Sequence, residues 1–288
     1  MAKKRIAYVS AELNKEDPDP DFDWPIFKQV CEDLPLDLRL VNWDDASVDW
    51  SEFDLAVVRS PWNYSNQREK FVSWAYRTEQ LTNLQNPAKI IEANTDKRYL
   101  LELAKVVPII PTFFIKEGQD ATLKINELFT QNQALAVKPS VGAGASLASR
   151  VTNPLAAKAA IDRILQAGFV AMVQPYFEEV DTAGEVAVVL VGGEISHAVR
   201  KVPALTVGGH GDPQEIVEVT EQMRDFVQKI SSQVGNFNEL LYARVDVVPT
   251  KSGLVLMELE MTEPTLFFEQ RPQAAKLLAN KVLGLLSG

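Results

Sequence analysis

The sequence predicts an α/β protein of several lobes, with a parallel sheet at its N-terminal end and antiparallel strands toward its C-terminal end. Short apolar runs alternate with amphipathic stretches in the first third of the chain, as in a parallel sheet flanked by helices. Further along, only Gly192-Gly193 separates two apolar runs, which is a strong hairpin signal. The chain has 288 residues, 46% of them hydrophobic, and this suits two or three lobes under the usual allowance of roughly 100–200 residues per domain.

The composition excludes several classes of protein. A formal net charge of −10 argues against a surface that follows nucleic-acid phosphates, so no nucleic-acid partner is expected. No apolar run approaches the roughly 20 residues that span a bilayer, and we expect a cytoplasmic protein that does not bind a membrane. The single cysteine, Cys31, excludes an internal disulfide and forms no zinc-type cluster with the two histidines, so any metal must be held mostly by oxygen.

The first predicted unit, residues 1–88, contains the parallel sheet. Its segment 13–23 is acidic and holds two prolines, so we expect a solvated loop there. The predicted strands are 5–10, 36–41 and 53–59, and the predicted helices are 24–34 and 67–81.

The second unit, 89–170, and the third unit, 171–288, follow from the same kind of pattern. Asn94-Thr95-Asp96 offers caps for a helix in the second unit. There we expect helices over 97–104, 121–131 and 153–167, strands over 109–115 and 135–139, and a small-residue loop over 140–146. The third unit is rich in strands, with expected strands over 170–174, 185–191, 194–202, 242–248 and 254–260, and helices over 221–234 and 272–286.

Three acidic residues near the C-terminal end form the most informative group. Glu258 and Glu260 are two residues apart on one predicted strand, so their side chains share a face at about 7 Å spacing. If this strand pairs with 242–248 as a hairpin, Asp246 faces them, with Arg244 beside it. Carboxylates so close repel one another unless a cation neutralises them, and magnesium takes carboxylates together with phosphate oxygens. The alternative is a solvated face of an edge hairpin, but the flanking apolar residues favour central strands.

Lys138 ends a predicted strand just before the small-residue loop. Backbone N–H groups of this loop, at Ser140, Gly142 and Gly144, can approach phosphate oxygens because no bulky side chains intervene. The loop lacks the residue order of a P-loop, and a flexible turn is the alternative interpretation. Lys138 and Lys97 could each equally be solvated surface lysines.

Two further strand segments carry candidate residues. Gln174-Pro175-Tyr176-Phe177 ends an apolar strand, where backbone groups could meet an adenine edge while Tyr176 or Phe177 lines its face; core aromatics at a strand exit are an equal alternative. Arg200 and Lys201 are adjacent on a strand, so at most one of them points directly into a given site. We favour Arg200 for phosphate chemistry because its fork suits bidentate contact, with Lys201 as the alternative. His197 is interpreted as a packed or rim residue.

Arg59 ends the third predicted strand of the first unit, followed closely by Trp62 and Tyr64. Ligands of parallel α/β sheets bind beyond the carboxyl ends of the strands, so Arg59 is a candidate to hold a substrate carboxylate. Packing between lobes is an equal alternative for Trp62 and Tyr64. Glu263, just past the acidic strand, is a candidate for binding a substrate amine, with a solvated loop carboxylate as the alternative.

Taken in order, these features resemble the ATP-grasp superfamily, which includes glutathione synthetase and D-alanine–D-alanine ligase, over nearly the whole chain. The shared order is a lysine early in the central lobe, a second lysine before a glycine-rich lid, a hinge and late acidic strands. The segments 58–64 and 194–201 look most like the subgroup that contains the cyclo-ligase of D-cycloserine biosynthesis. Glu260 departs from the asparagine common in such proteins, but a carboxylate is also a competent magnesium ligand.

The resemblance implies an ATP-grasp fold in which 1–88 is a pre-ATP-grasp substrate domain, 89–170 the central lobe with the lid loop, and 171–288 the C-terminal lobe with the metal site. It implies ATP with Mg²⁺, two ions being expected and Mn²⁺ a substitute. By resemblance, Lys97 and Lys138 would bind the ATP phosphates, Gln174 to Phe177 would hold adenine, and Glu185 would lie near the ribose. Lys201 is a further candidate for binding ATP. Asp246, Glu258 and Glu260 would bind the metal ions.

Together these expectations predict an ADP-forming ligase, present as a monomer or homodimer. The γ-phosphoryl group of ATP would pass to a small-molecule carboxylate, and an amine-type nucleophile of a second molecule or of the same one would displace phosphate, with Arg200 and Arg244 stabilising the developing charge. The alternative is a catalytically inactive nucleotide-binding regulator of the same fold, which the intact acidic trio disfavours. A dinucleotide-binding oxidoreductase is excluded because no G-x-G-x-x-G follows Val9.

Overall fold

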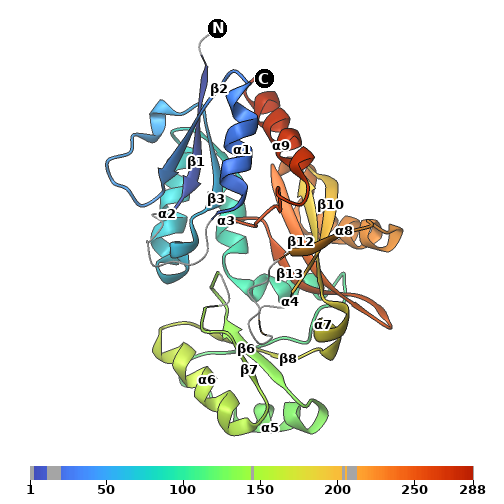
Figure 1. The fold of residues 1–288 in the computed structure, drawn as a ribbon. Helices are drawn as coiled ribbons and strands as arrows, with labels where there is room; N and C mark the ends of the chain where they lie inside the picture. Colours follow the sequence, from blue (N-terminus) through green and yellow to red (C-terminus); the bar gives the residue numbers. More distant parts are fainter. Residues whose placement is uncertain (1–2, 12–20, 144–145, 203–204, 206–212, 288) are drawn as a thin grey trace.

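The computed structural model describes residues 3–11, 21–143, 146–202, 205 and 213–287. Three sheets define three lobes, which Figure 1 shows in blue, green and yellow to red along the chain. The N-terminal sheet is parallel and the other two are antiparallel, which confirms the predicted fold class. None of the helices within these ranges has the length and apolar character that crossing a membrane requires. Most of segment 13–23 and Gly144 lie outside the described residues.

The N-terminal lobe is a four-stranded parallel sheet in the order β2-β1-β3-β4. Every residue of β3 is buried, because both faces of the sheet are covered. Ile6, Tyr8, Leu55 and Val57 face a core shared with α1 and α9, while the alternating residues face α2. The elements are β1 (Lys4–Ser10), α1 (Asp23–Glu32), β2 (Leu36–Asn42), η1 (Trp50–Glu52), β3 (Leu55–Ser60), η2 (Trp62–Asn66), α2 (Arg68–Glu79) and β4 (Asn83–Gln85). The three-residue strand β4 was not predicted.

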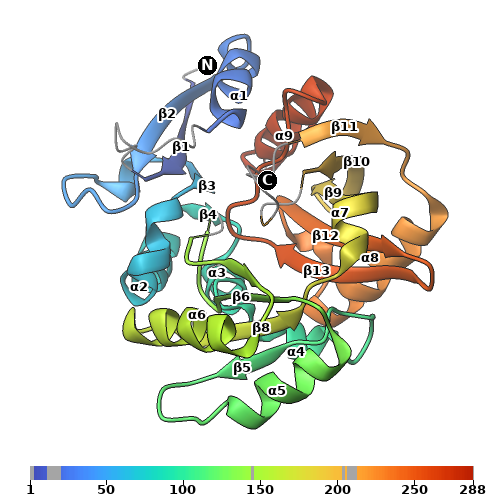
Figure 2. The same ribbon diagram turned by 60° about the horizontal axis from the view of Figure 1, so that its bottom comes forward.

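The central lobe is an antiparallel sheet in the order β5-β8-β6-β7, with α5 and α6 on the face turned away from the other lobes (Figures 1 and 2). Helix α6 begins where expected, because the Asn153 side chain accepts a hydrogen bond from the Ala156 amide and Pro154 follows the cap. The elements are β5 (Phe113–Ile115), α5 (Thr122–Gln131), β6 (Leu135–Pro139), β7 (Ser149–Val151), α6 (Pro154–Gln166) and β8 (Ala171–Pro175).

Two strands expected in this part of the chain pair with other strands than we had predicted. Strand β8, which we had assigned to the unit 171–288, pairs with β5 and β6 and so stands in the central sheet. The expected strand 109–115 is split, because Ile109 bridges to Leu256 of the C-terminal lobe and only 113–115 join the central sheet. An apolar run has the same local pattern in either sheet, so its partner is set by tertiary contacts. The boundaries of the three units as domains stay a prediction.

The C-terminal lobe is a five-stranded antiparallel sheet in the order β11-β10-β9-β12-β13. The β9–β10 hairpin turns at Gly192 and Gly193, with φ of 58° and 82°, values that glycine adopts without strain. Helix α8 covers one face, while α9 lies beside α1 on the other (Figure 1). The elements are α7 (Glu178–Ala183), β9 (Glu185–Val191), β10 (Glu194–Lys201), β11 (Pro213–Val217), α8 (Glu221–Val234), η4 (Phe237–Glu239), β12 (Tyr242–Thr250), β13 (Gly253–Glu260) and α9 (Pro272–Leu285).

Two buried asparagines join the lobes through backbone hydrogen bonds. They flank α3 (Ala88–Asn94), which leads into η3 (Lys97–Tyr99) and α4 (Leu100–Leu103). The Asn86 amide donates to the carbonyl oxygens of Tyr242 and Met261 at 2.8 and 2.7 Å and accepts from the Leu241 amide at 2.8 Å. Asn94 donates to the Leu259 carbonyl at 2.7 Å and accepts from the Met261 amide at 2.6 Å. These bonds satisfy backbone groups at the start of β12 and at the end of β13, which would otherwise be unpaired.

We expect Asn86→Ala to lower the free energy of unfolding by about 2–4 kcal/mol, because it leaves three buried backbone groups without partners. Urea unfolding followed by circular dichroism measures this change. Asn83→Ala in the neighbouring exposed position is the matched control and should have little effect. Equal stability of the two variants would contradict the role given to Asn86.

His197 on β10 is a buried histidine, as expected for a packed residue. Its side chain is 3% exposed, its Nδ1 lies 3.1 Å from Ser196 Oγ, and its Nε2 has no partner among the described residues. Burial, together with the charge of Arg271, lowers the pKa of His197 to about 4. The neutral imidazole is therefore the folded form at pH 7.

Because the folded pKa of His197 lies below its unfolded value of about 6.5, the unfolded chain binds the extra proton between these values. The stability that His197 contributes is thus present above pH 6.5 and is lost as the pH falls toward about 4. We expect His197→Gln to lose less stability than the wild type between pH 7 and pH 5 in urea titrations. Parallel losses in the two proteins would show that other groups govern this window.

Candidate active site

The acidic residues of β12 and β13 lie on one face of the C-terminal sheet. In the antiparallel register Asp246 stands opposite Glu258, and Arg244 stands opposite Glu260. Side chains alternate along a strand, so these four groups share a face, which confirms the predicted arrangement. Strand β12 is central, between β9 and β13, but β13 is an edge strand, so the expectation of two central strands was half right.

The opposite face of the same strands is apolar, and this fixes which way the charges point. Val245 and Leu259 are fully buried in the core under α8. The register shifts after Asp246, so that Val247 pairs with Leu256 and Met257 is an extra residue on β13. Such a bulge bends the strand and re-aims side chains, and here it directly precedes Glu258.

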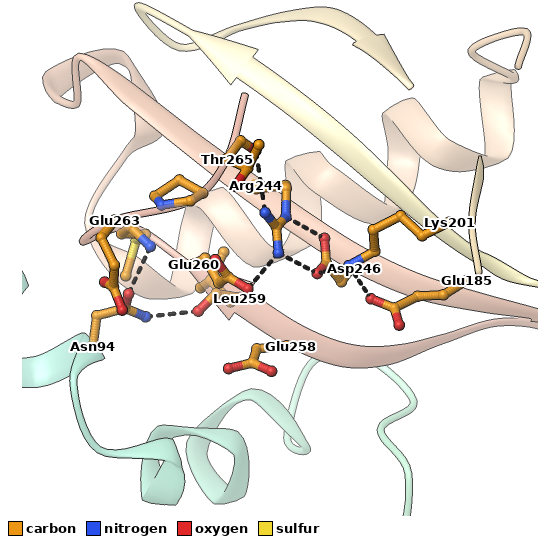
Figure 3. Close-up of polar contacts among 12 residues, drawn as sticks. Asn94, Glu185, Lys201, Arg244, Asp246, Glu258, Leu259, Glu260, Glu263 and Thr265 are labelled. Carbon is orange, nitrogen blue, oxygen red and sulfur yellow. Dashed lines mark hydrogen bonds and ion pairs between the residues drawn. The ribbon is translucent and has the colours of Figure 1, made fainter. Parts of the chain in front are cut away.

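Arg244 is the centre of a network of ion pairs, which Figure 3 shows. Its Nε and Nη2 donate to the two oxygens of Asp246 at 2.8 and 2.9 Å, and its Nη2 also donates to Glu260 Oε1. Its Nη1 donates to the carbonyl oxygen of Thr265 at 3.1 Å. The Arg244 side chain is buried. Its hydrogen bonds to both strands and to the segment after β13 hold the guanidinium in one orientation.

Lys201, rather than Arg200, points into this network. Lys201 Nζ donates to Asp246 Oδ2 at 2.7 Å and forms an ion pair with Glu185 (Figure 3). The preference for Arg200 was wrong, because Arg200 turns to the other side of β10, where its Nε donates to Glu215 Oε1 at 3.1 Å. Glu185, expected near a ribose, lies beside Lys201 and Asp246.

The central lobe contributes two lysines to the same region. Lys97 Nζ lies 3.1 Å from Glu258 Oε1 and donates to the carbonyl oxygen of Gly142 at 2.8 Å, while the Lys97 amide donates to the carbonyl oxygen of Ser140 at 2.8 Å. Lys138 is half-buried; burial lowers its pKa, and the charge of Glu258 acts in the opposite direction. The loop that follows β6 is thus joined to the acidic face through Lys97.

The acidic side chains differ in their electrostatic state. Burial raises the pKa of Glu260 to about 8, and the charges of Asp246 and Glu258 add to the rise. For Asp246, burial is outweighed by Arg244 and Lys201, which hold its pKa below the usual range. For Glu258, burial is likewise outweighed by Lys97 and Lys138, and its pKa is lowered. Glu260 is therefore the carboxyl group of this trio whose ionised form its surroundings disfavour most.

These residues fit a hard divalent cation by their donor chemistry. Glu258 and Glu260 keep 21% and 24% of their side chains exposed. The charges of Asp246 and Glu258 disfavour the ionised form of Glu260. A bound cation would relieve that repulsion. Among the described residues, no three acidic, histidine or cysteine side chains form a closed metal-binding group, because each carboxylate here is turned toward an arginine or lysine. Their metal-binding role stays a prediction.

The N-terminal lobe reaches this region through Tyr64 and Glu263. Tyr64 in η2 donates its hydroxyl to Glu263 Oε1 at 2.6 Å, and its ring stacks on Phe71 at 4.9 Å. Burial raises the pKa of Glu263, while the Tyr64 hydrogen bond and the charge of Lys97 lower it. Tyr64 and Glu263 were predicted as separate candidate residues, and the structure brings them together. Trp62 is half-buried in the same turn.

The candidate adenine segment forms the end of β8 and the start of α7. Gln174 is buried and donates to Thr112 Oγ1 at 2.8 Å, while Pro175 pairs with Leu135 of β6. The Tyr176 ring lies 3.8 Å from the guanidinium carbon of Arg150, and Phe177 precedes the first residue of α7. The segment connects the central sheet to β9, as expected of a hinge, and its nucleotide role stays a prediction.

Arg59 does not lie with the acidic residues. Its side chain is 1% exposed and pairs with Asp23, also 1% exposed, at 3.0 Å. The placement favours packing between lobes over the substrate contact predicted for Arg59. Asp23 was not among the predicted site residues, because the segment 13–23 was expected to be a solvated loop. The signal was present, since Asp23, Phe27 and Cys31 recur every four residues along the buried face of α1.

Two family models match the chain, one within the N-terminal lobe and one that spans the central and C-terminal lobes. Residues 6–86 match the model of the N-terminal domain of the D-cycloserine synthetase DcsG. Residues 96–273 match the model of the ATP-grasp domain of prokaryotic glutathione synthetase. The second match covers more than half of the chain.

Individual relatives agree with these matches. The cycloserine biosynthesis protein DcsG of Streptomyces lavendulae is 29% identical over 262 residues, which are 85% of this chain and 88% of that protein. The crystal structure of D-cycloserine synthetase DcsG superposes with a TM-score of 0.86 at 27% identity, covering 98% of this chain and 99% of the other. The structure of D-alanyl-alanine synthetase A from Vibrio cholerae shares the fold, with a TM-score of 0.71 at 15% identity over 100% of this chain and 99% of the other.

These matches confirm the resemblance found from the sequence and extend over all three lobes. The three lysines, the arginine and the three carboxylates described above lie within the matched ATP-grasp domain. The chain belongs to the glutathione synthetase-like ATP-grasp family of ATP-dependent ligases.

Proposed function

We propose that this ligase is ADP-forming and activates a small-molecule carboxylate as an acylphosphate for attack by an amine-type nucleophile. One observation carries the proposal. Asp246 and Glu258 stand directly opposite each other, with Glu260 on the same face, and basic groups from two lobes converge on them. Such a set of charges suits a nucleoside triphosphate and its divalent cation, because the carboxylates offer oxygen ligands for the cation and the basic groups can bind the phosphates.

The chain would bind the nucleotide between the central and C-terminal lobes. Lys97, Lys138 and Lys201 supply positive charge for the phosphates, and the backbone at Ser140 and Gly142 supplies polar groups at the lid. Lys97 already bridges the lid to Glu258 through its contacts to Gly142 O at 2.8 Å and Glu258 Oε1 at 3.1 Å. The adenine base would lie along the hinge residues and the ribose near Glu185. The hinge residues are Gln174, Pro175, Tyr176 and Phe177.

Asp246, Glu258 and Glu260 would hold Mg²⁺, for which Mn²⁺ could substitute, and two ions are proposed. When bound, the ions neutralise phosphate charge and act as Lewis acids. To coordinate a metal ion, Asp246 and Glu260 would have to lose the hydrogen bonds that they accept from Arg244. Asp246 would also have to lose the one that it accepts from Lys201. Arg244 and Lys201 would then be released toward the transferred phosphoryl group, where their positive charge stabilises the transition state.

The acid substrate would lie between the N-terminal lobe and the acidic face. Tyr64 and Glu263 meet there at 2.6 Å, and Glu263 carries a charge suited to an ammonium group. Similarity to a cycloserine biosynthesis protein supports a nucleophile that belongs to the same molecule as the carboxylate, so that the reaction closes a ring.

Glu258→Gln and Asp246→Asn should reduce ADP release by at least about 100-fold, because each removes a charged metal ligand. The measurement is a coupled assay for ADP with a panel of carboxylate and amine pairs, in excess Mg²⁺ and again after chelation. Glu194→Gln is the matched control, since Glu194 lies on β10 of the same sheet with its side chain 73% exposed. Near-normal turnover in both variants would remove the metal assignment.

Substitution of the neighbouring residues Arg200 and Lys201, one at a time, tests which of the two basic groups acts on the transferred phosphoryl group. Lys201→Met should lower kcat by roughly 100-fold, as for loss of one preorganised charge at the transferred group, whereas Arg200→Met should stay near the wild-type value. The reverse order would show that the two side chains exchange sides when nucleotide binds.

The rival function, a nucleotide-binding regulator without turnover, predicts a different outcome of the same assay. ATP binding without ADP release for every substrate pair would support the regulator. Release of ADP that depends on a particular carboxylate would support the ligase and would identify its acid substrate.

A further inference from the structure

The short segment 264–268, which follows β13, is held on one side by the buried pair Asp23 and Arg59. Arg59 Nη2 donates to the carbonyl oxygen of Pro264 at 2.7 Å. Asp23 accepts from the Leu266 amide at 2.6 Å and from the Phe268 amide at 2.9 Å. Both side chains belong to the N-terminal lobe, one at the start of α1 and one near the end of β3.

The same segment contacts Arg244 on its other side. The Thr265 carbonyl accepts from Arg244 Nη1 at 3.1 Å, as Figure 3 shows, and the Phe267 ring lies 5.5 Å from the guanidinium carbon. Phe267 has a φ of 53°, a left-handed conformation that costs energy for a residue with a side chain. Contacts therefore alternate along the segment, with 264, 266 and 268 held by the N-terminal lobe and 265 and 267 holding Arg244.

The attraction between the two charges alone gives little reason to keep this pair. A fully buried ion pair gains little net free energy, because its attraction is offset by the loss of hydration. Within the described residues, Arg59 Nε and Nη1 have no hydrogen-bond partner, and the guanidinium carbon lies 4.7 Å from the Tyr242 ring. Apolar side chains could fill the same volume, but they would leave three backbone groups of 264–268 without partners. The contribution specific to Asp23 and Arg59 is the geometry that they impose on 264–268.

We propose that Asp23 and Arg59 are positioning residues for Arg244. By fixing alternate backbone groups of 264–268, they set the Thr265 carbonyl and the Phe267 ring against the guanidinium, and so set its aim toward the transferred phosphoryl group. The inference rests on the proposed function of Arg244. It gives the N-terminal lobe a part in phosphoryl transfer, and it assigns Arg59 to Arg244 in place of the substrate carboxylate.

Asp23→Asn should lower kcat by about 10- to 100-fold, because a neutral side chain with one carbonyl acceptor cannot hold both backbone amides, and a misplacement near 1 Å can cost about 100-fold. The KM for ATP should stay within about twofold of the wild type, since the three lysines are unchanged. Arg59→Lys keeps the charge and should cause a smaller loss. Hydrogen exchange of a peptide covering 261–268 should become faster in both variants.

Trp50→Leu is the control for a purely structural loss. Trp50 lies in the N-terminal core against Trp74, with ring centroids 5.2 Å apart, and has no described contact with 264–268. It should lower the melting temperature at least as much as Asp23→Asn, yet leave kcat and the exchange of 261–268 near wild type. Arg244→Lys combined with Asp23→Asn should lose little more kcat than Arg244→Lys alone, because the two changes act on one group.

Three kinetic results would overturn the inference. One is wild-type kcat in folded Asp23→Asn and Arg59→Lys, and another is an equal loss of kcat in Trp50→Leu. The third is a raised KM for the acid with unchanged kcat, which would return Arg59 to substrate binding. Absence of ADP release by the wild type would count against the proposed function instead. Even then, unchanged hydrogen exchange of 261–268 in Asp23→Asn and Arg59→Lys would reject the positioning role of Asp23 and Arg59.

Discussion

The register of β12 against β13 is the constraint on which the rest of the site depends. It places Asp246 opposite Glu258 and Arg244 opposite Glu260, with the apolar face of both strands packed under α8. A slip of one residue would send these charges into the core and the valines and leucines that now pack under α8 to the surface. The hydrophobic packing of the sheet therefore stabilises a charged surface that attraction between its ion pairs alone would not hold together.

That surface gathers nearly balanced charge from separate parts of the chain. Its five carboxylates are Glu185, Asp246, Glu258, Glu260 and Glu263, and its four cations are Lys97, Lys138, Lys201 and Arg244. In the described arrangement the basic groups occupy carboxylate oxygens that metal ions would use. A nucleotide with its cations would exchange these partners, the metal taking carboxylates and the phosphates taking lysine and arginine.

Local patterns in the sequence predicted most strands and helices, because alternation, caps and the Gly192-Gly193 turn act over a few residues. They also placed the acidic trio on one face. Local patterns could not decide which of Arg200 and Lys201 enters the site, since that depends on which face of β10 meets Asp246. The contact between Asp23 and the Leu266 amide joins residues 243 positions apart, and no local pattern encodes it. For β8, the strand itself was evident, but its sheet was set by distant partners.

The central claim is that the acidic trio holds divalent cations against the phosphates of ATP. Isothermal titration of ATP into the wild type and into Glu258→Gln, each with and without Mg²⁺, tests it most directly. The account predicts that Mg²⁺ strengthens ATP binding to the wild type and that most of this gain disappears in Glu258→Gln, while binding without Mg²⁺ does not weaken. An equal gain from Mg²⁺ in both proteins would contradict it.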